Sequence, residues 1–389
     1  MSSKLNVLSL TAGDAFLETG DDGSLNQQQL RQIEYAKHLN KYIIVTRTLG
    51  TRFEPVPLAP NLIVYPTNST GRFSAMRDVM RIASSICEKQ KIDVISPRDP
   101  YFFGRIGFKL KQKYKIPIVI HVMGDMINNK NFFRERFGNR VLNYYAKKLL
   151  QKADAIRVST TREKQKLIQI GFPEEKIFRV PFFVELAPFL NAGKSSKREE
   201  LLQDRFEKIV LTVSRLSREK NVEMLIRIAA KVVRKNRKIL FVVIGGGMLM
   251  DALKNKAEYL GVGENILFTG KIDNLLLPQY YHAADVFAIT SFYEGTCMVL
   301  LEAAASGLPI VSTDTAGAAD AIIKGKTGYI LPVNAIDEFS MVLLDVLYNP
   351  ESKKMGIEGR EYIQSKFDKE SIIKDYIRMW EYSASKKPV

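Results

Sequence analysis

Short runs of apolar, mostly β-branched residues recur along the whole chain and alternate with longer segments of helical periodicity. The predicted strands are residues 6–10, 42–46, 62–65, 93–96, 117–122 and 155–159 in the first half, and 209–214, 240–244, 266–269, 286–290 and 310–313 in the second. Continuous apolar strands that alternate with helices are typical of parallel, doubly wound sheets. The pattern therefore predicts an α/β protein that binds its ligands beyond the carboxyl ends of the strands.

The length of the chain indicates two domains of ordinary size. Each half of the 389 residues is long enough to bury its own core, and a polar stretch at residues 191–198 separates the halves. We expect one domain over residues 1–190 and a second over residues 199–368. A hydrophobic content of 46% with 26% charged residues describes a soluble globular protein.

The sequence also bears on where the protein works. No run approaches the roughly 18 apolar residues of a membrane span, and the first residues lead directly into a predicted strand instead of a signal-peptide core. Cys87 and Cys297 lie far apart and lack the spacing of a metal or redox motif, so we interpret both as small buried hydrophobes. We therefore expect a cytoplasmic protein without disulfides.

The charge of the chain is strongly positive. Its 58 basic and 42 acidic residues give a net charge of +16, and residues 98–152 hold thirteen basic residues against three acidic ones. Such a surface attracts nucleic acid, anionic lipid or phosphorylated ligands alike. We find no recognition-helix signature and no stacked aromatic motif, so a nucleic-acid-binding protein is only an alternative hypothesis.

Residues 131–152 predict a single amphipathic helix with two possible roles. Its apolar stripe is made up of Phe133, Phe137, Val141, Tyr144 and Leu149. In the simpler interpretation this stripe faces the core. In the other, the basic residues of the helix attach the protein to an anionic membrane surface, peripherally and on the inner face. Both interpretations remain open at this point.

Two carboxylates bracket the start of a helix in the second half of the chain. Residues 286–317 read as a buried strand, a turn, a helix ended by Gly307 and Pro309, and a second strand. Glu294 lies in the turn, and Glu302 lies about two turns into the helix, within an apolar run. A carboxylate on such a helix needs a polar partner. Carboxylates with perturbed surroundings at a helix mouth favour a functional site.

Several other residues could hold an anion. Arg215 and Lys220 lie between the strand at 209–214 and the following helix, where side chains and the helix dipole together bind phosphate. Gly245 opens a triple-glycine turn, and Gly23 lies in a glycine loop after the first strand, but neither fits a dinucleotide fingerprint. His121, one of three histidines, ends a predicted strand and has no partners for a metal site.

The residues around the two glutamates resemble a known signature. Ser291, Glu294, Gly295, Glu302, Ala303, Gly307 and Pro309 resemble the E-x7-E signature of the family 4 glycosyltransferases (glycosyl transferases group 1). The resemblance extends over nearly the whole chain and is strongest at residues 209–332. It implies the GT-B fold, in which two doubly wound, Rossmann-like domains face a central cleft. It also implies that the last helix, in residues 369–389, crosses back to the first domain.

The resemblance assigns roles to the candidate residues. It implies that Glu302 binds the ribose of a nucleotide sugar, that Glu294 addresses the transferred sugar, and that Arg215 and Lys220 clamp the diphosphate. It also places His121 against the donor sugar. The remaining expected donor contacts are Gly23, Gly245, Gly295, Thr296 and Cys297. Ser214 stands where many members have glycine.

The expected function is a metal-independent, retaining glycosyltransferase. Its donor would be a UDP- or GDP-linked sugar with no further cofactor, and its acceptor a glycan or lipid-linked glycan in cell-surface polysaccharide synthesis. No D-x-D motif is present to hold a metal, since Asp21 and Asp22 are adjacent. A nucleotide-sugar epimerase of the same fold is the alternative within the enzymes.

Overall fold

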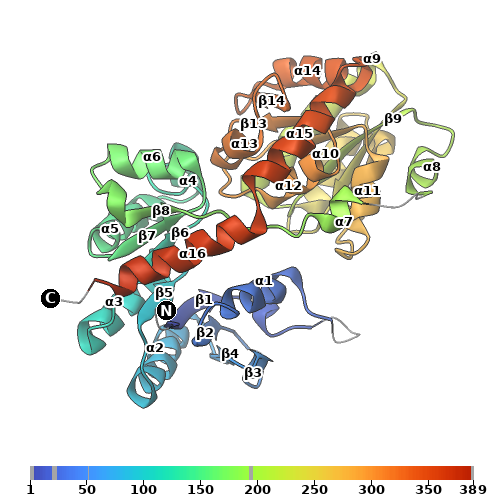
Figure 1. Cartoon of the computed structure of the whole chain (residues 1–389). Coiled ribbons are helices and arrows are strands. Elements are labelled where there is room, and N and C mark those ends of the chain that lie inside the picture. The colour runs from blue at the N-terminus through green and yellow to red at the C-terminus, as the bar shows by residue number, and fades with distance from the viewer. Residues whose placement is uncertain (1–3, 20–23, 51, 192–195, 387–389) are drawn as a thin grey trace. The chain divides into compact units, whose positions relative to one another are not determined.

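The computed structural model describes residues 4–19, 24–50, 52–191 and 196–386, and the chain divides into two compact units (Figure 1). Unit 1 contains residues 1–183 and 369–389, and unit 2 contains residues 184–368. The sequence placed the first boundary at residues 191–198, part of which lies outside the described residues. The structural boundary falls a few residues earlier, after Phe183.

Unit 1 is built on two parallel sheets joined edge to edge. The strand orders are β3-β4-β2-β1-β5 and β6-β7-β8, and a parallel bridge between Ile95 and Ile118 links them. The strands are β1 (Asn6–Ala12), β2 (Lys41–Arg47), β3 (Val56–Ala59), β4 (Leu62–Pro66), β5 (Val94–Pro97), β6 (Val119–Val122), β7 (Ala155–Val158) and β8 (Ile177–Arg179). Among the described strands of unit 1, only β3, at the edge, pairs antiparallel.

Helices cover both faces of these strands. They are α1 (Gln27–Ala36), α2 (Arg72–Lys89), α3 (Phe102–Tyr114), α4 (Lys130–Glu135), α5 (Gly138–Gln151), α6 (Thr161–Gln169) and α16 (Lys369–Ala384). On one face, α2 and α3 share a core with β1, β2 and β5, and α5 and α6 share a core with β6 and β7. On the other face, α16 packs on β5, β6 and β7 and contacts α1 (Figure 1).

Unit 2 is a six-stranded parallel sheet of order β11-β10-β9-β12-β13-β14. Its strands are β9 (Lys208–Val213), β10 (Ile239–Ile244), β11 (Ile266–Gly270), β12 (Val286–Ile289), β13 (Ile310–Thr313) and β14 (Gly328–Leu331). Its helices are α7 (Ala187–Leu190), α8 (Lys197–Leu202), α9 (Val222–Lys235), α10 (Met250–Tyr259), α11 (Leu277–Ala283), α12 (Met298–Ala305), α13 (Ala316–Ala321), α14 (Ile336–Tyr348) and α15 (Ser352–Lys366). The main core lies between this sheet and helices α9 and α14.

The predicted doubly wound α/β class is confirmed in both units. All eleven predicted strands are present within a few residues of their expected bounds. The pattern missed β3, β8 and β14, which have only three or four residues each. Such short runs give too few alternations to stand out from loops.

The predicted helix at residues 131–152 is wrong in two respects. The chain breaks between α4 and α5 at residues 136–137, and the stripe expected to face the core is largely exposed after the break. Phe137 is 84% exposed, and Val141 and Tyr144 are about half exposed. The inner face of α5 instead carries Asn139 and Asn143 with Ala146 and Leu150. The break shifts the helical phase, so residues before and after it no longer share a face.

His121 belongs to the core of unit 1. It lies inside β6, is fully buried, and its Nε2 is 2.8 Å from Ser96 Oγ. Its Nδ1 is 3.3 Å from an Arg157 nitrogen and 3.4 Å from the Tyr376 hydroxyl of α16. Burial, reinforced by Arg157 and Arg98, holds the pKa of His121 well below its usual value. This placement argues against the predicted contact with a donor sugar.

The neutral state of His121 makes stability depend on pH. Because the folded pKa lies below the unfolded value of about 6.5, the unfolded chain binds one more proton below that pH. The unfolding free energy of unit 1 should therefore fall by about 1.4 kcal/mol per pH unit below pH 6.5 from this residue alone. Urea unfolding of the wild type and of His121→Gln, from pH 7.5 down to pH 5.5, should show a shallower decline in the variant. Equal pH dependence in both proteins would refute this account.

Candidate functional site

Two loops meet at the carboxyl edge of the sheet in unit 2. They follow β9 and β12, which are neighbours in the sheet, so both loops leave the same edge side by side. The N–H of Phe292 donates to the carbonyl of Glu219 at 2.8 Å, and the Thr290 hydroxyl donates to the carbonyl of Asn221 at 2.9 Å. These bonds fix one loop against the other where ligands of such sheets bind.

An ion pair between Lys220 and Glu294 lies at the centre of this junction. Lys220 Nζ is 2.5 Å from Glu294 Oε1, and the side chains are only 14% and 13% exposed. The Ser291 hydroxyl donates to the same oxygen at 2.7 Å. Two of the predicted site residues, 74 positions apart in the chain, are thus brought into direct contact. The arrangement offers a cation and a carboxylate to a polar ligand at the same point.

Arg215 lies in the same loop but is much more exposed. Its side chain is 77% exposed and pairs with Glu219 at 3.0 Å. Such a solvated pair contributes little and exchanges easily for another anion. Arg215 also lines a cavity of about 580 Å³ at the carboxyl ends of β9, β10 and β11.

This cavity combines predicted and unpredicted residues. The predicted ones are Arg215 and Gly245, while Lys271, Asp273 and Asn274 were missed. The missed residues follow β11 directly, so their position after a predicted parallel strand was the available signal. Val299 of α12 closes the cavity on another side. The volume is in the range of small-molecule sites.

Glu302 has the polar partner that its apolar helix requires. The hydroxyl of Tyr281, from α11, donates to Glu302 Oε2 at 2.8 Å. Tyr281 is fully buried, and burial together with the neighbouring carboxylate raises its pKa well above the usual value. The tyrosine therefore remains a hydrogen-bond donor and orients the carboxylate. Glu302 lies one turn beyond Val299, which lines the cavity.

The turn before α12 is held by close backbone packing. A Cβ atom on Gly317 would lie 2.1 Å from the carbonyl oxygen of Gly295, so only glycine fits there. Thr296 is half-buried, and Cys297 is buried beside Gly317. Burial raises the pKa of the Cys297 thiol well above its usual value, which agrees with its interpretation as a small buried hydrophobe. Contact of Cys297 with a donor would then come from its backbone.

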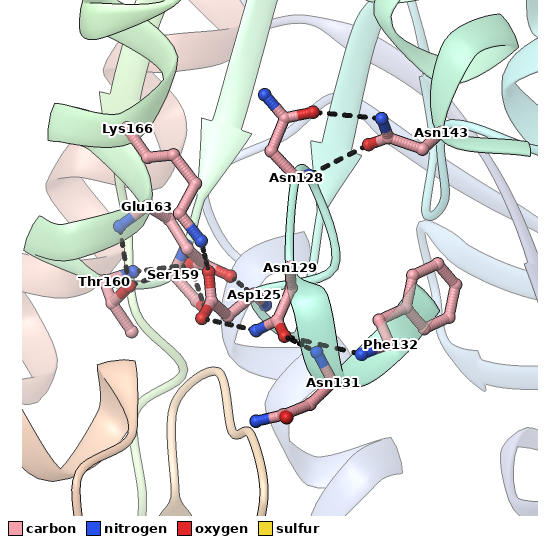
Figure 2. A network of polar contacts seen from close by, with 10 residues as sticks. All are labelled: Asp125, Asn128, Asn129, Asn131, Phe132, Asn143, Ser159, Thr160, Glu163 and Lys166. Carbon is pink, nitrogen blue, oxygen red and sulfur yellow. Dashed lines mark hydrogen bonds and ion pairs between the residues drawn. The ribbon is translucent and has the colours of Figure 1, made fainter. Parts of the chain in front are cut away.

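Two predicted site residues, His121 and Gly23, belong to the first half of the chain. His121 is in the core of unit 1, and Gly23 lies outside the described residues. The notable feature at the carboxyl edge of unit 1 is instead a polar network around Glu163 (Figure 2). This network was not predicted, although the capping sequence Thr160-x-x-Glu163 is a visible signal for part of it.

Glu163 ties the loop after β6 to the turn after β7. Its carboxylate accepts from the N–H of Asp125 at 2.6 Å, from the N–H of Thr160 at 2.9 Å and from the Ser159 hydroxyl at 2.8 Å. Lys166 pairs with Asp125, whose other oxygen accepts from the Asn129 amide at 3.0 Å (Figure 2). Burial raises the pKa of Glu163, while these bonds oppose that rise. The network gives this edge of unit 1 a fixed loop.

The described part of the chain holds no group of three or more His, Cys, Asp or Glu side chains that could bind a metal ion. Among its helices, none has both the length and the apolar character needed to cross a bilayer.

The close approach of two loops at Gly245 gives a testable prediction. Gly245 has φ +130°, and a Cβ atom there would lie 1.9 Å from the carbonyl oxygen of Ser214. Gly245→Ala should therefore lower the unfolding free energy by about 2 kcal/mol or more, since both the conformation and the contact are forbidden. The matched control is Gly246→Ala, whose Cβ would meet only the flexible Lys271 side chain, at 3.3 Å. Urea unfolding followed by circular dichroism measures both, and equal midpoints would contradict the prediction.

Two models of known families match this chain, one in each half. A family model described as Glycosyltransferase Family 4 matches residues 34–187, and one described as Glycosyl transferases group 1 matches residues 193–362. The D-inositol 3-phosphate glycosyltransferase of Nocardia farcinica is 26% identical over 337 residues, which cover 80% of this chain and 74% of that protein.

Solved structures show the same fold. A sucrose-phosphate synthase from Thermosynechococcus elongatus superposes with a TM-score of 0.81 at 21% identity, covering 97% of this chain and 98% of that one. The Anabaena protein HepE, solved in complex with UDP-glucose, gives a TM-score of 0.72 at 17% identity and covers 98% of this chain and 100% of that one. With both halves matched, the chain belongs to the family 4 glycosyltransferases (glycosyl transferases group 1), and it has the GT-B fold.

Proposed function

We propose that this glycosyltransferase moves a sugar from a UDP- or GDP-linked donor to a glycan or lipid-linked acceptor, with retention of configuration and without a divalent metal. The observation that carries the proposal is the Lys220–Glu294 contact between the loops after β9 and β12, the first of which also carries Arg215 of the cavity. HepE, which shares the fold, is solved with UDP-glucose, and this supports a nucleotide sugar as the donor.

In the proposed complex the nucleoside occupies the cavity near Gly245. Glu302, oriented by the Tyr281 hydroxyl, accepts hydrogen bonds from the ribose, because its carboxylate is already fixed by a donor on one oxygen. Gly245 allows the nucleotide to approach the backbone after β10. Gly295 and Thr296 would offer backbone contacts just before α12.

Charge that accumulates on the departing diphosphate needs fixed cations. During transfer the bond from the anomeric carbon to the diphosphate oxygen breaks, and the diphosphate leaves with the electron pair. In the proposed complex, Lys220 and Arg215, with the N–H groups at the start of α12, stabilise that charge. These groups supply the stabilisation for which other transferases use a divalent cation.

Retention follows if the acceptor attacks from the side that the diphosphate leaves. The acceptor oxygen forms the new bond to the anomeric carbon, and its proton passes to the leaving diphosphate oxygen. No covalent protein nucleophile is required, so positioning is the main demand on the site. Glu294, held by Lys220 and Ser291, would fix the hydroxyls of the sugar for this attack.

The proposal also covers the acceptor and the place in the cell where the enzyme works. The Nocardia relative acts, by its name, on an inositol phosphate, so a phosphorylated or lipid-linked acceptor is chemically reasonable here. The exposed Phe137, just before α5, and the exposed Val141 and Tyr144 within it are interleaved with basic residues, which supports peripheral work at an anionic membrane. We propose a role in cell-surface polysaccharide synthesis on the inner face of that membrane.

Removing the central cation tests the mechanism. Lys220→Ala should lower kcat for sugar transfer by a factor of about 100 to 1,000, as expected when one charge-stabilising group is lost. Arg227→Ala is the matched control, because Arg227 is an exposed helical cation paired with Glu223 at 2.6 Å. Activity should also persist in a metal chelator, and the product should keep the anomeric configuration of the donor.

A binding screen identifies the donor, and the transfer assay decides whether the proposed mechanism holds. A panel of nucleotide sugars, screened by thermal stabilisation of the wild type, selects the base and the sugar. Near-normal transfer by Lys220→Ala, or equal losses in both variants, would refute the role given to the ion pair. Loss of transfer on chelation would refute the metal-independent part of the proposal.

A further inference from the structure

A second hollow lies in unit 1, away from the loops described above. It is a groove of about 460 Å³ between α2 and α3, which lie side by side on one face of the sheet (Figure 1). Its walls combine cations with apolar side chains, and it contains no acidic residue. The residues that matter are Phe73, Arg77, Met80, Arg81, Arg105 and Lys109.

Helical spacing places the cations in two facing rows. Phe73, Arg77 and Arg81 recur every four residues and therefore follow one face of α2. Arg105 and Lys109 do the same on α3. All four cations are exposed, whereas Ile106 is buried and forms part of the floor. The groove is thus a cationic channel with an apolar base.

The positive charge of the groove is not neutralised by any residue that the structure describes. The side chains of Arg77, Arg81, Arg105 and Lys109 make no hydrogen bond or ion pair with the described part of the chain. Further along the same two helices a cation is neutralised, because Lys113 of α3 pairs with Glu88 of α2 at 3.1 Å. Four like charges gathered in one hollow repel one another, so an anion that enters the groove relieves that repulsion.

Apolar groups lie at the same surface. Phe73, in the first turn of α2, is fully exposed, although an aromatic side chain ordinarily covers apolar surface. On the other side of α3, Lys111 donates to the Lys152 carbonyl at 3.2 Å and so joins α3 to the end of α5. The exposed Val141 and Tyr144 therefore belong to a helix that contacts α3, and the exposed Phe137 directly precedes that helix.

We propose that the groove receives the phosphate headgroup of an acidic phospholipid in a bilayer, with Phe73 entering the interfacial region. The inference rests on the proposed function only in that it supplies the membrane contact of the transferase. Cations beside exposed aromatic and aliphatic groups match the headgroup and acyl boundary of an anionic leaflet. A site for a free phosphate would instead have buried donors, and the four cations here are exposed.

Vesicle co-sedimentation of the full chain tests the proposal without any transfer assay. The vesicles contain phosphatidylcholine alone or with phosphatidylglycerol, at low salt. The triple variant Arg77→Gln, Arg81→Gln, Lys109→Gln should lower partitioning onto the anionic vesicles by about 100-fold, since each cation near the surface is worth about fivefold. Phe73→Ser should lower it by a smaller factor, and added salt should weaken wild-type binding.

The matched control removes a neutralised cation from the same pair of helices. Lys113→Gln should change partitioning by less than about twofold, because Glu88 already balances that charge. Circular dichroism confirms that the exposed substitutions leave the fold intact. A transferase-inactive Lys220→Ala protein should bind vesicles as the wild type does, so failure of the proposed function and failure of this site give different results.

Five results would overturn the proposal. The first four are wild-type binding by the triple variant, an equal loss in Lys113→Gln, equal partitioning onto phosphatidylcholine vesicles, and full displacement by millimolar glycerol phosphate. Displacement by duplex DNA at the same phosphate concentration as the lipid would identify a nucleic-acid surface and would also overturn it. Retention on anionic vesicles that depends on the groove cations and not on Lys113 supports it.

Discussion

The contact between Lys220 and Glu294 is the interaction on which the site in unit 2 depends. Both side chains are mostly buried, and a buried charge without a partner costs several kcal/mol. Each residue therefore requires the other, and because they come from different loops the pair fixes the two loops together. The backbone bonds from Phe292 and Thr290 reinforce the same junction. A polar ligand that arrives here meets groups whose positions are already set, so little ordering cost remains.

Close backbone packing supplies the second constraint. Gly245 and Gly247 lie so near the loop after β9 that any Cβ atom would overlap its carbonyl groups, and Gly317 does the same for the turn before α12. These glycines allow three loops to converge at one edge of the sheet. The ion pair sets the chemistry of the site and the glycines set its spacing, so neither would build the site alone.

The sequence predicted the parts of the structure that depend on local pattern. The alternation of apolar strands with helices predicted the doubly wound sheets. The apolar surroundings of Glu302 predicted that its carboxylate has a polar partner, and that partner is Tyr281. The partner itself was not predictable, because it comes from another helix and no spacing rule links the two. The carboxyl end of β6 was predicted correctly at residue 122, but the burial of His121 was not predictable, because the Tyr376 hydroxyl beside it comes from the distant helix α16.

The orientation of α5 was predicted wrongly because contacts made outside the helix decide which of its faces is buried. Asn139 and Asn143 are buried because they satisfy backbone groups of the preceding turn: the Asn139 amide donates to the Phe132 carbonyl at 2.7 Å, and Asn143 accepts from the N–H of Asn128 at 2.9 Å. A pattern of apolar residues cannot reveal such polar burial, since the hydrogen bonds are made outside the helix. Although Ala146 and Leu150 further along α5 join the core of unit 1, asparagines occupy the inner face of the first turns, so Val141 and Tyr144 lie outside and are about half exposed. Their exposure follows from the capping chemistry of one loop, and it leaves an apolar, basic helix available for a surface that the protein itself does not provide.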